Sequence, residues 1–239
     1  MNKGRLILIP SALAETNSAK QFPQDTLDET FALKHFVAER AKTARHFLKS
    51  IGYPHHFSEV EVMELNKHGE DDLPQLLQFC EQGIDTGLIS EAGVPGVADP
   101  GGIIVREAHR RGIGIVSLIG PSSLLLALMG SGMNGQNFHF HGYLPREDAD
   151  LIKFIKTLEV QSRQEDVTQM FIETPYRNDK LLPALLKHLS PQTDLCVASN
   201  LTAPNESIVT KSIELWRKSG IVLGKKPAVF LLFSGKLHS

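Results

Sequence analysis

Four segments of this sequence place glycine, proline, hydroxyl and acidic residues where predicted strands end. The richest runs over 90–101 and reads Ser-Glu-Ala-Gly-Val-Pro-Gly-Val-Ala-Asp-Pro-Gly. Its glycines permit close approach and positive φ, whereas its prolines fix φ and remove hydrogen-bond donors. Such a segment between a strand and a helix indicates a preformed ligand-binding wall, because open α/β sheets bind ligands there. A long, purely structural connection is the alternative.

Three further polar segments follow the same pattern. Gly120-Pro121-Ser122-Ser123 opens an apolar helix predicted over 124–129, where Ser122 or Ser123 would cap the helix or offer donors to a polar cofactor. Glu173-Thr174-Pro175-Tyr176-Arg177 and the segment 200–206 each follow a predicted strand. Their repetition favours a binding site at strand ends, although Thr-Pro and Ala-Pro pairs also simply end an element.

Metal and nucleophile motifs are missing from the sequence. It contains no His-Glu-x-x-His, no paired Cys-x-x-Cys and no phosphate-binding loop of the Walker type. His139 and His141 share one face of a strand without an acidic or cysteine partner nearby in sequence, so we expect packing or surface roles for them. Cys80 and Cys196 lie in apolar stretches and are predicted to be buried thiols. The sequence therefore predicts no metal site.

Strands alternate with helices along the whole chain. This alternation predicts two small α/β domains with largely parallel sheets, residues 1–119 and residues 120–239, which pack together and favour a cleft. The predicted strands are Arg5–Ile9, Phe36–Ala38, Val60–Leu65, Ile84–Ile89, Ile113–Ile119, Phe138–His141, Gln169–Ile172, Leu195–Ser199, Ser207–Thr210 and Ala228–Phe233. The predicted helices are Ala41–Ile51, Asp71–Gln82, Ile103–Arg111, Leu124–Met129, Ala149–Leu158, Asn178–Leu189 and Ile213–Lys218.

Charge and hydropathy exclude several classes of protein. The net charge of -2 gives no global field for a polyanion, so a nucleic-acid partner would need a local basic patch. The best candidate is the predicted helix 41–51, on which Lys42, Arg45, His46 and Lys49 lie together at helical spacing, with Arg40 beside them. A solvated basic face is the alternative. No apolar run reaches the length of a signal peptide or membrane span, so we expect a cytoplasmic protein.

These segments resemble the tetrapyrrole methylase superfamily. The stretch 90–101 is similar to that family's Ser-Asp-Ala-Gly-Thr-Pro-x-x-x-Asp-Pro-Gly segment, and the branch it resembles methylates a cytidine 2'-oxygen of small-subunit ribosomal RNA. Matching segments follow in order over nearly the whole chain: Gly120–Ser123, Phe140–Pro145, Glu173–Arg177, Leu201-Thr202 and Glu206. The resemblance implies two α/β domains with S-adenosylmethionine in the cleft between them, within a homodimer.

The resemblance also implies which residues contact the cofactor. In the first domain and at the domain junction they are Pro10, Gly93, Val94, Pro95, Ser122 and Ser123. In the second domain they are Glu173, Leu201 and Ala228.

The sequence departs from the RNA-methylating branch at three places. That branch carries Pro-x-Pro-Ile-Gly-Asn-Leu after the first strand, whereas this chain reads Pro-Ser-Ala-Leu-Ala-Glu-Thr from Pro10. Glu-Asp-Thr-Arg is replaced by Glu39-Arg40-Ala41-Lys42, and Arg-Glu-Leu-Thr-Lys is replaced by the residues 199–203. The replaced residues lie where the resemblance would put the substrate and the catalytic base, whereas the matching segments surround the cofactor.

Methyl transfer to a ribose hydroxyl benefits from a positioned base, because the hydroxyl is a poor acid. Glu39, at the end of the second predicted strand, is the candidate, and a surface ion pair with Arg40 or Lys42 is the alternative. The hypothesis is therefore an S-adenosylmethionine-dependent methyltransferase acting on ribosomal RNA. A tetrapyrrole or protein acceptor, or a catalytically silent homologue that binds S-adenosylmethionine or RNA, are the alternatives.

Overall fold

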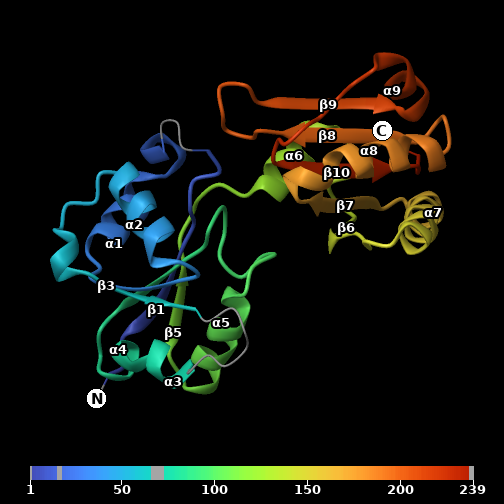
Figure 1. The fold of residues 1–239 in the computed structure, drawn as a ribbon. Helices are drawn as coiled ribbons and strands as arrows, with labels where there is room; N and C mark the ends of the chain where they lie inside the picture. The colour runs from blue at the N-terminus through green and yellow to red at the C-terminus, as the bar shows by residue number, and fades with distance from the viewer. Residues whose placement is uncertain (1, 15–17, 66–72, 237–239) are drawn as a thin grey trace. The chain divides into compact units, whose positions relative to one another are not determined.

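The computed structural model describes residues 2–14, 18–65 and 73–236, which form two compact units. The first unit ends at Ser122 and the second begins at Ser123, whereas the sequence placed the boundary before Gly120. Each unit contains one five-stranded sheet with helices on both faces, as Figure 1 shows. The prediction of two α/β domains is therefore confirmed.

The sheet of the first unit is entirely parallel. Its strand order is β3-β2-β4-β1-β5, and every paired neighbour runs in the same direction. The central strands are buried on both faces, as is usual for parallel sheets covered by helices. The strands are β1 (Arg5–Ile9), β2 (His35–Ala38), β3 (Glu61–Glu64), β4 (Thr86–Ile89) and β5 (Gly114–Ser117).

Helices cover both faces of this sheet and make two separate apolar cores. One core joins the sheet to α1 (Gln24–Phe31) and α2 (Ala41–Ser50), and the other joins it to α3 (Leu73–Leu76), α4 (Gln78–Glu81) and α5 (Gly101–Arg110) (Figure 1). Short 3₁₀ turns occupy Ser18–Gln21 and Phe57–Glu59.

The structure differs from the helices predicted for this unit in two ways. The helix expected over 71–82 is divided into α3 and α4, and its first two residues lie outside the described part of the chain. Helix α1 was not predicted, because Leu27 is its only buried apolar residue. Its other buried positions are Thr26 and Thr30, whose hydroxyls donate to the carbonyls of Ile119 and Thr26. Side-chain hydrogen bonds formed on folding satisfy these polar groups, so no apolar periodicity marks the helix in the sequence.

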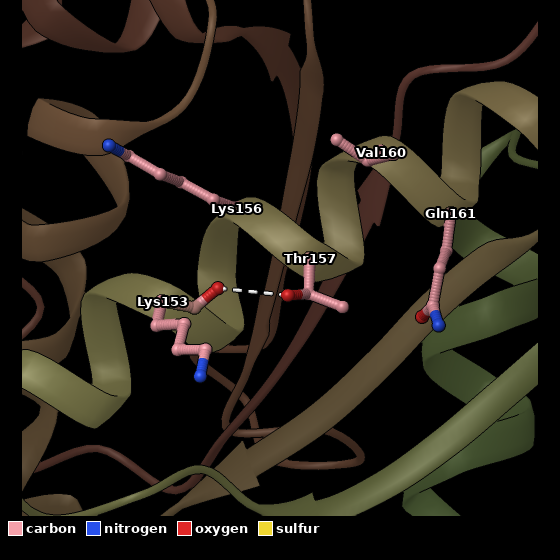
Figure 2. Close-up of a pocket in the computed structure, with 5 residues that line it drawn as sticks. All are labelled: Lys153, Lys156, Thr157, Val160 and Gln161. Atoms are coloured by element: carbon pink, nitrogen blue, oxygen red, sulfur yellow. Dashed lines mark hydrogen bonds between the residues drawn. The ribbon is translucent and has the colours of Figure 1, made fainter.

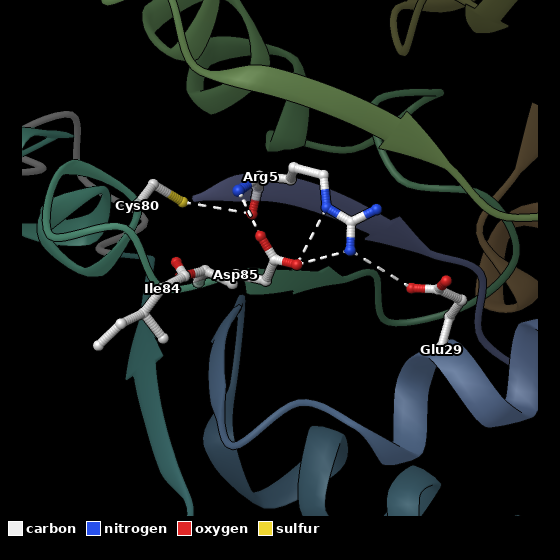
Figure 3. Close-up of polar contacts among 6 residues, drawn as sticks. Arg5, Glu29, Cys80, Ile84 and Asp85 are labelled. Atoms are coloured by element: carbon white, nitrogen blue, oxygen red, sulfur yellow. Dashed lines mark hydrogen bonds and ion pairs between the residues drawn. The ribbon is translucent and has the colours of Figure 1, made fainter. Parts of the chain in front are cut away.

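An ionic contact joins Arg5, the first residue of β1, to Asp85, the residue just before β4, at the amino edge of the sheet (Figure 3). The Arg5 guanidinium donates to Asp85 Oδ2 at 2.6 Å and 3.0 Å, and the Arg5 backbone N–H donates to Oδ1 at 2.6 Å. Glu29 of α1 lies 3.7 Å from the same guanidinium. Burial raises the pKa of Asp85, but the hydrogen bonds and charge of Arg5 outweigh burial and leave this pKa below its usual value.

The sheet of the second unit is mixed, so the prediction of largely parallel strands is wrong for this unit. Only β6 and β7 pair in parallel, whereas β10 is antiparallel to both β7 and β8, and β8 is antiparallel to β9. The last strand inserts between two earlier ones, a pairing that no local pattern encodes. The strands, in the order β6-β7-β10-β8-β9, are β6 (Phe138–Tyr143), β7 (Thr168–Glu173), β10 (Ala228–Phe233), β8 (Asp194–Ser199) and β9 (Ser207–Ser212).

The two faces of this mixed sheet are covered differently. Three helices share one apolar core on the first face: α7 (Asp148–Glu165), α8 (Asn178–His188) and α9 (Ile213–Ser219). Helix α6 (Ser123–Ser131) lies on the other face, where a Cβ added to Gly130 would stand 2.7 Å from Ile208 of β9. Glycine is therefore required at this position for the close packing of helix on strand.

A buried carboxylate ties α7 to the turn that leads into β8. Glu159 is 8% exposed, and its Oε1 accepts the backbone N–H of Ser190 at 2.7 Å and the hydroxyl of Thr193. Its Oε2 accepts the hydroxyl of Ser190 at 3.1 Å. A buried charge is tolerated here because hydrogen bonds replace its hydration.

We predict that Glu159→Ala destabilises the protein by about 1–3 kcal/mol, because it leaves buried donors of the turn without an acceptor. Glu159→Gln should lose much less, since its amide oxygen still accepts from Ser190 N–H and its nitrogen can donate to the Ser190 hydroxyl. Thermal or urea unfolding of the three proteins measures the difference. Equal stability of the alanine and glutamine variants would contradict this role of the carboxylate.

Candidate active site

The parallel sheet of the first unit has a topological switch point between β1 and β4. The chain leaves β1 through α1 toward β2, and it leaves β4 through α5 toward β5, so the connections of two neighbouring strands run in opposite directions. In open α/β sheets the ligand crevice forms at the carboxyl ends of such strands. The loop from Ser90 to Gly101 lies at this point, as the sequence predicted.

Hydrogen bonds lock the two loops at the switch point together. Ser11, which follows β1, donates its N–H to the Gly93 carbonyl at 2.8 Å, and Gly93 N–H donates back to the Ser11 carbonyl at 3.1 Å. The buried Ser11 hydroxyl donates to the Ser90 carbonyl at 2.6 Å, and the Ser90 hydroxyl donates to the Gly93 carbonyl at 2.6 Å. The wall is therefore preformed, and sequence analysis missed Ser11 as one of its parts.

Gly93 has a backbone conformation that favours glycine, and it leaves space open beside Leu13 and Pro121. Its φ is +71°, and an added Cβ would stand 3.3 Å from Leu13 Cδ2 and 3.6 Å from the Pro121 carbonyl oxygen. Gly120 approaches Pro10 so closely that its Cβ would lie 2.5 Å from the proline Cβ. The structure thus brings together the predicted residues of the first unit: Pro10, Gly93 with its neighbours Val94 and Pro95, and the segment that leads to Ser122.

Asp99 organises the rest of the loop. Its Oδ1 accepts the N–H of Gly96 at 2.7 Å and the N–H of Gly101 at 2.9 Å, which joins the loop to the first residue of α5. Burial raises the pKa of Asp99, and the two backbone donors offset only part of this rise. Sequence analysis assigned no role to Asp99, although aspartate just before a helix is a common capping signal.

Three of the predicted residues in the second unit, Glu173, Leu201 and Ala228, also lie together. Ala228, the first residue of β10, pairs with Glu173 at the end of β7 and with Ser199 at the end of β8. Leu201 follows Ser199 in a turn where Asn200 and Thr202 have φ values of 51° and 67°. Positive φ is unfavourable for a β-branched residue and marks this turn as strained. The predicted residues therefore form two clusters, one in each unit.

Glu173 is a buried charge with few partners. Its side chain is fully buried, and its Oε1 accepts the N–H of Thr174 at 2.7 Å. Its Oε2 lies 3.1 Å from Arg177 Nη1 as an ion pair, but no well-directed hydrogen bond reaches this oxygen among the described residues. Glu173 Oε2 is therefore attracted by the charge of Arg177 and keeps hydrogen-bonding capacity beside Ala228.

Glu39 follows β2 at the same edge of the parallel sheet at which the Ser90 loop follows β4. It follows Ala38, which pairs with Ile89, so Glu39 and Ser90 come directly after paired residues of β2 and β4. The side chain of Glu39 is partly exposed. Glu64, at the end of β3, has a different role, because its Oε1 accepts the N–H of Ala41 at 2.6 Å and caps α2. This edge carries a carboxylate near the wall, as a general base would require.

A shallow hollow of about 340 Å³ lies elsewhere, on the outer face of α7 (Figure 2). Lys153, Lys156, Thr157, Val160 and Gln161 line it, and the Thr157 hydroxyl donates to the Lys153 carbonyl at 3.0 Å. None of the predicted site residues lines this hollow. Within the described ranges no cluster of three metal-binding side chains occurs either.

The chain is similar in sequence to proteins named ribosomal RNA small subunit methyltransferase I, although no protein-family model matches it. The protein from Leptospira biflexa is 29% identical over 208 residues, which cover 87% of this chain and 81% of that protein. The protein from Micromonospora olivasterospora is 32% identical over 152 residues, which cover 63% of this chain but only 47% of that protein.

Solved structures share the fold at low sequence identity. Uroporphyrin-III-C-methyltransferase from Thermus thermophilus matches with a TM-score of 0.58 and 17% identity, covering 97% of this chain and 95% of that one. Diphthine synthase matches with a TM-score of 0.68 and 16% identity, covering 98% and 90%. The fold is therefore that of two-domain methylases. The resemblance to the tetrapyrrole methylase superfamily is confirmed, and the similar sequences are those of its ribosomal RNA branch.

We predict that Asp99→Ala destabilises the protein by about 1 kcal/mol, the usual cost of losing a capping side chain. Asp99→Asn should retain the loop, because its amide oxygen accepts the same two N–H groups. The raised pKa means that the protonated form stabilises the fold below the ordinary value of 3.8 and that this contribution is lost as pH rises through the higher folded pKa.

Thermal unfolding over an acidic to neutral pH series measures both effects. The asparagine variant should therefore gain stability relative to the parent as the pH rises through this range, since it carries no buried charge. A constant stability difference between the two proteins over the whole series would contradict the raised pKa of Asp99.

Proposed function

We propose that this protein is an S-adenosylmethionine-dependent methyltransferase that acts on small-subunit ribosomal RNA. The observation that carries the proposal is the locked Ser11–Gly93 bridge at the switch point of a sheet with the methylase fold. The similarity to ribosomal RNA methyltransferases over 87% of the chain supports the choice of acceptor. We further propose that the protein works in the cytoplasm as a homodimer; none of the described helices is long and apolar enough to cross a membrane.

The residues at the switch point fit a flat, polar cofactor. A Cβ at Gly93 would fill space beside Leu13 and the Pro121 carbonyl, so only glycine leaves this space open. The cofactor supplies a methyl group bound to a positively charged sulfur. In the proposal, Pro10, Gly93, Val94 and Pro95 bind it mainly through the backbone, Ser122 and Ser123 offer donors at the start of α6, and Glu173, Leu201 and Ala228 of the second unit contribute the remaining contacts.

The protein's own task in such a transfer is alignment and exclusion of water, since the leaving group becomes neutral. A rigid wall suits this task because it need not reorganise during the reaction. Glu39 would accept the proton of the ribose hydroxyl as that oxygen forms its new bond to carbon. Its position after β2, next to Ser90 in the register, supports this role.

One departure from the RNA-methylating branch has a local structural reason. Asn200, where that branch has glutamate, adopts φ 51° and donates its N–H to the Pro227 carbonyl at 3.0 Å. Asparagine tolerates the left-handed conformation better than glutamate does. The substitution therefore suits the turn beside Ala228, and it does not by itself favour a silent homologue.

Helix α2 supports RNA as the acceptor. Among the described residues, no carboxylate forms an ion pair with Arg40, Lys42, Arg45 or Lys49. Arg40 and Lys42 stand at the amino end of the helix, where the dipole disfavours positive charge. Cations that gain nothing from local pairing are available to contact phosphates.

Transfer of labelled methyl groups tests the proposed function. We predict that the purified protein labels RNA when it is mixed with methyl-labelled S-adenosylmethionine and separated RNA, protein and small-molecule fractions from cells that lack it. Gly93→Val should retain the fold yet lose cofactor binding, because valine is strained at φ +71° and fills the cradle. Glu39→Gln should bind the cofactor normally and lower kcat by about 100-fold or more.

Three outcomes would contradict parts of this proposal. Methyl label in the protein or small-molecule fraction, and not in RNA, would show that the methyl acceptor is a protein or a small molecule. Cofactor binding without label in any fraction would favour a silent homologue. If calorimetry shows that Gly93→Val binds the cofactor with unchanged affinity, the Ser90–Gly101 loop is not part of the cofactor site.

The basic helix yields a separate prediction. Lys42→Glu combined with Arg45→Glu should weaken binding of ribosomal RNA and reduce the salt dependence by up to about 0.9 in log–log slope for each phosphate that the helix no longer neutralises. Cofactor affinity should not change. The matched control is Arg106→Glu with Arg110→Glu on α5, which reverses two exposed charges in the same unit. Equal RNA affinity of the two double variants across a salt series would exclude a special role for α2.

A further inference from the structure

An aromatic ring and a lysine stand exposed beside the cluster of the second unit. Tyr176 lies in the short 3₁₀ turn Pro175–Arg177 between β7 and α8, and it is 79% exposed. Lys225 places its Nζ 5.1 Å from the centroid of the Tyr176 ring. A large aromatic side chain this exposed gains little from the protein core, and its pairing with a cation is typical of surfaces that stack on nucleic-acid bases.

Buried hydrogen bonds hold the lysine loop against the tyrosine turn. Asn178, which is fully buried at the start of α8, donates through Nδ2 to the carbonyls of Gly224 at 3.0 Å and Lys226 at 2.7 Å. Asp179 Oδ1 accepts the N–H of Gly224 at 3.1 Å. Lys225 is therefore carried by a loop that is fixed on both sides of it, so the pair is positioned before any partner arrives.

An ion pair joins Arg177, the residue after Tyr176, to the predicted cofactor residue Glu173. Arg177 contacts Glu173 with Nη1 at 3.1 Å and donates from Nη2 to the Pro145 carbonyl at 3.3 Å. Tyr176 therefore precedes Arg177, whose side chain is held at the buried end of β7. A base stacked on this ring would lie beside the second-unit cluster.

The charges around Tyr176 favour a polyanion. Arg177 and Lys180 are matched by Glu173 and Asp148, and Asp179 is engaged by the Gly224 N–H. Among the described residues, no carboxylate forms an ion pair with Arg146, Lys225 or Lys226. Glu147 and Asp150 are the acidic neighbours of Arg146 along the chain that remain. Unpaired cations around an exposed ring match the phosphates and the flat face of a single-stranded nucleotide.

We propose that Tyr176 and Lys225 form a stacking platform for an unpaired base of the RNA substrate, with Lys225 contacting the adjacent phosphate. This inference rests on the proposed function in taking RNA as the partner, and it adds a substrate contact that is separate from α2. It concerns binding and positioning of the RNA, because Tyr176 touches no reacting atom in this proposal. Stacking does not distinguish between bases, so the platform selects a single-stranded segment over duplex.

The test measures binding of a short single-stranded oligoadenylate RNA to the full chain by fluorescence anisotropy. Tyr176→Ala should weaken binding by about 5- to 100-fold, the range expected for one stacked base, and the factor should be the same at low and high salt. Tyr176→Phe should bind like the parent, since the ring and not the hydroxyl does the stacking. Lys225→Ala should weaken binding by a factor that shrinks as salt is added.

Matched controls separate stacking from general effects. Phe138→Ala removes a 41% exposed aromatic ring at the start of β6, and Lys187→Ala removes an exposed lysine near the end of α8. Both controls should bind the probe like the parent. Thermal unfolding should be unchanged in Tyr176→Ala, because the side chain is exposed.

Any of three results would contradict the proposed stacking platform: the parent does not bind the probe, Tyr176→Ala binds it with the affinity of the parent, or Tyr176→Ala and Phe138→Ala lose the same amount of affinity. A change in oligomeric state of Tyr176→Ala on gel filtration, with RNA binding intact, would assign the surface to a second copy instead. If the parent methylates RNA and Tyr176→Ala does so with unchanged KM, the platform fails while the proposed function stands.

Discussion

The candidate site depends on one short antiparallel bridge between loops that are far apart in the sequence. Ser11 and Gly93 exchange two backbone hydrogen bonds, and the hydroxyls of Ser11 and Ser90 close further bonds within the same few residues. These bonds satisfy backbone groups that a loop at a strand end would otherwise leave to water. The bridge therefore fixes the loop rigidly at the point where the parallel sheet reverses its connections, and the positions of Pro10, Pro95 and Gly120 follow from it.

Charges in this protein divide into those that hold the fold and those that remain available. Three interactions connect separate elements through directed hydrogen bonds or ion pairs. They join Arg5 to Asp85, Arg177 to Glu173, and Glu159 to its turn. Arg40, Lys42, Arg45 and Lys49 at α2, and Lys225 and Lys226, form no ion pair with a carboxylate among the described residues. Although the net charge is -2, each unit has a local basic surface. Such surfaces would allow an acidic protein to bind RNA, as proposed.

The sequence predicted the parallel unit better than the mixed one. In the first unit, each strand is followed by a helix, so the regular alternation specifies parallel neighbours. In the second unit, β10 enters between β7 and β8, and its partners are chosen by packing of residues such as Phe230 against Phe171. Because helices cover both faces of this sheet, β7, β8 and β10 are buried almost continuously, as the strands of a parallel sheet are. The sequence therefore predicted the strands of this unit but not their directions.

The sequence by itself determined the loop composition on which the site depends. Glycine at position 93 and proline at position 95 restrict the backbone locally, and Glu173, Leu201 and Ala228 lie at strand ends that local patterns identify. Only the tertiary structure decided that Ser11 bonds Gly93, and that α1 forms with Thr26 bonded to the Ile119 carbonyl. The physical reason is that these features depend on hydrogen bonds whose donors and acceptors meet only when strands distant in sequence have paired, whereas glycine and proline act through their own dihedral angles.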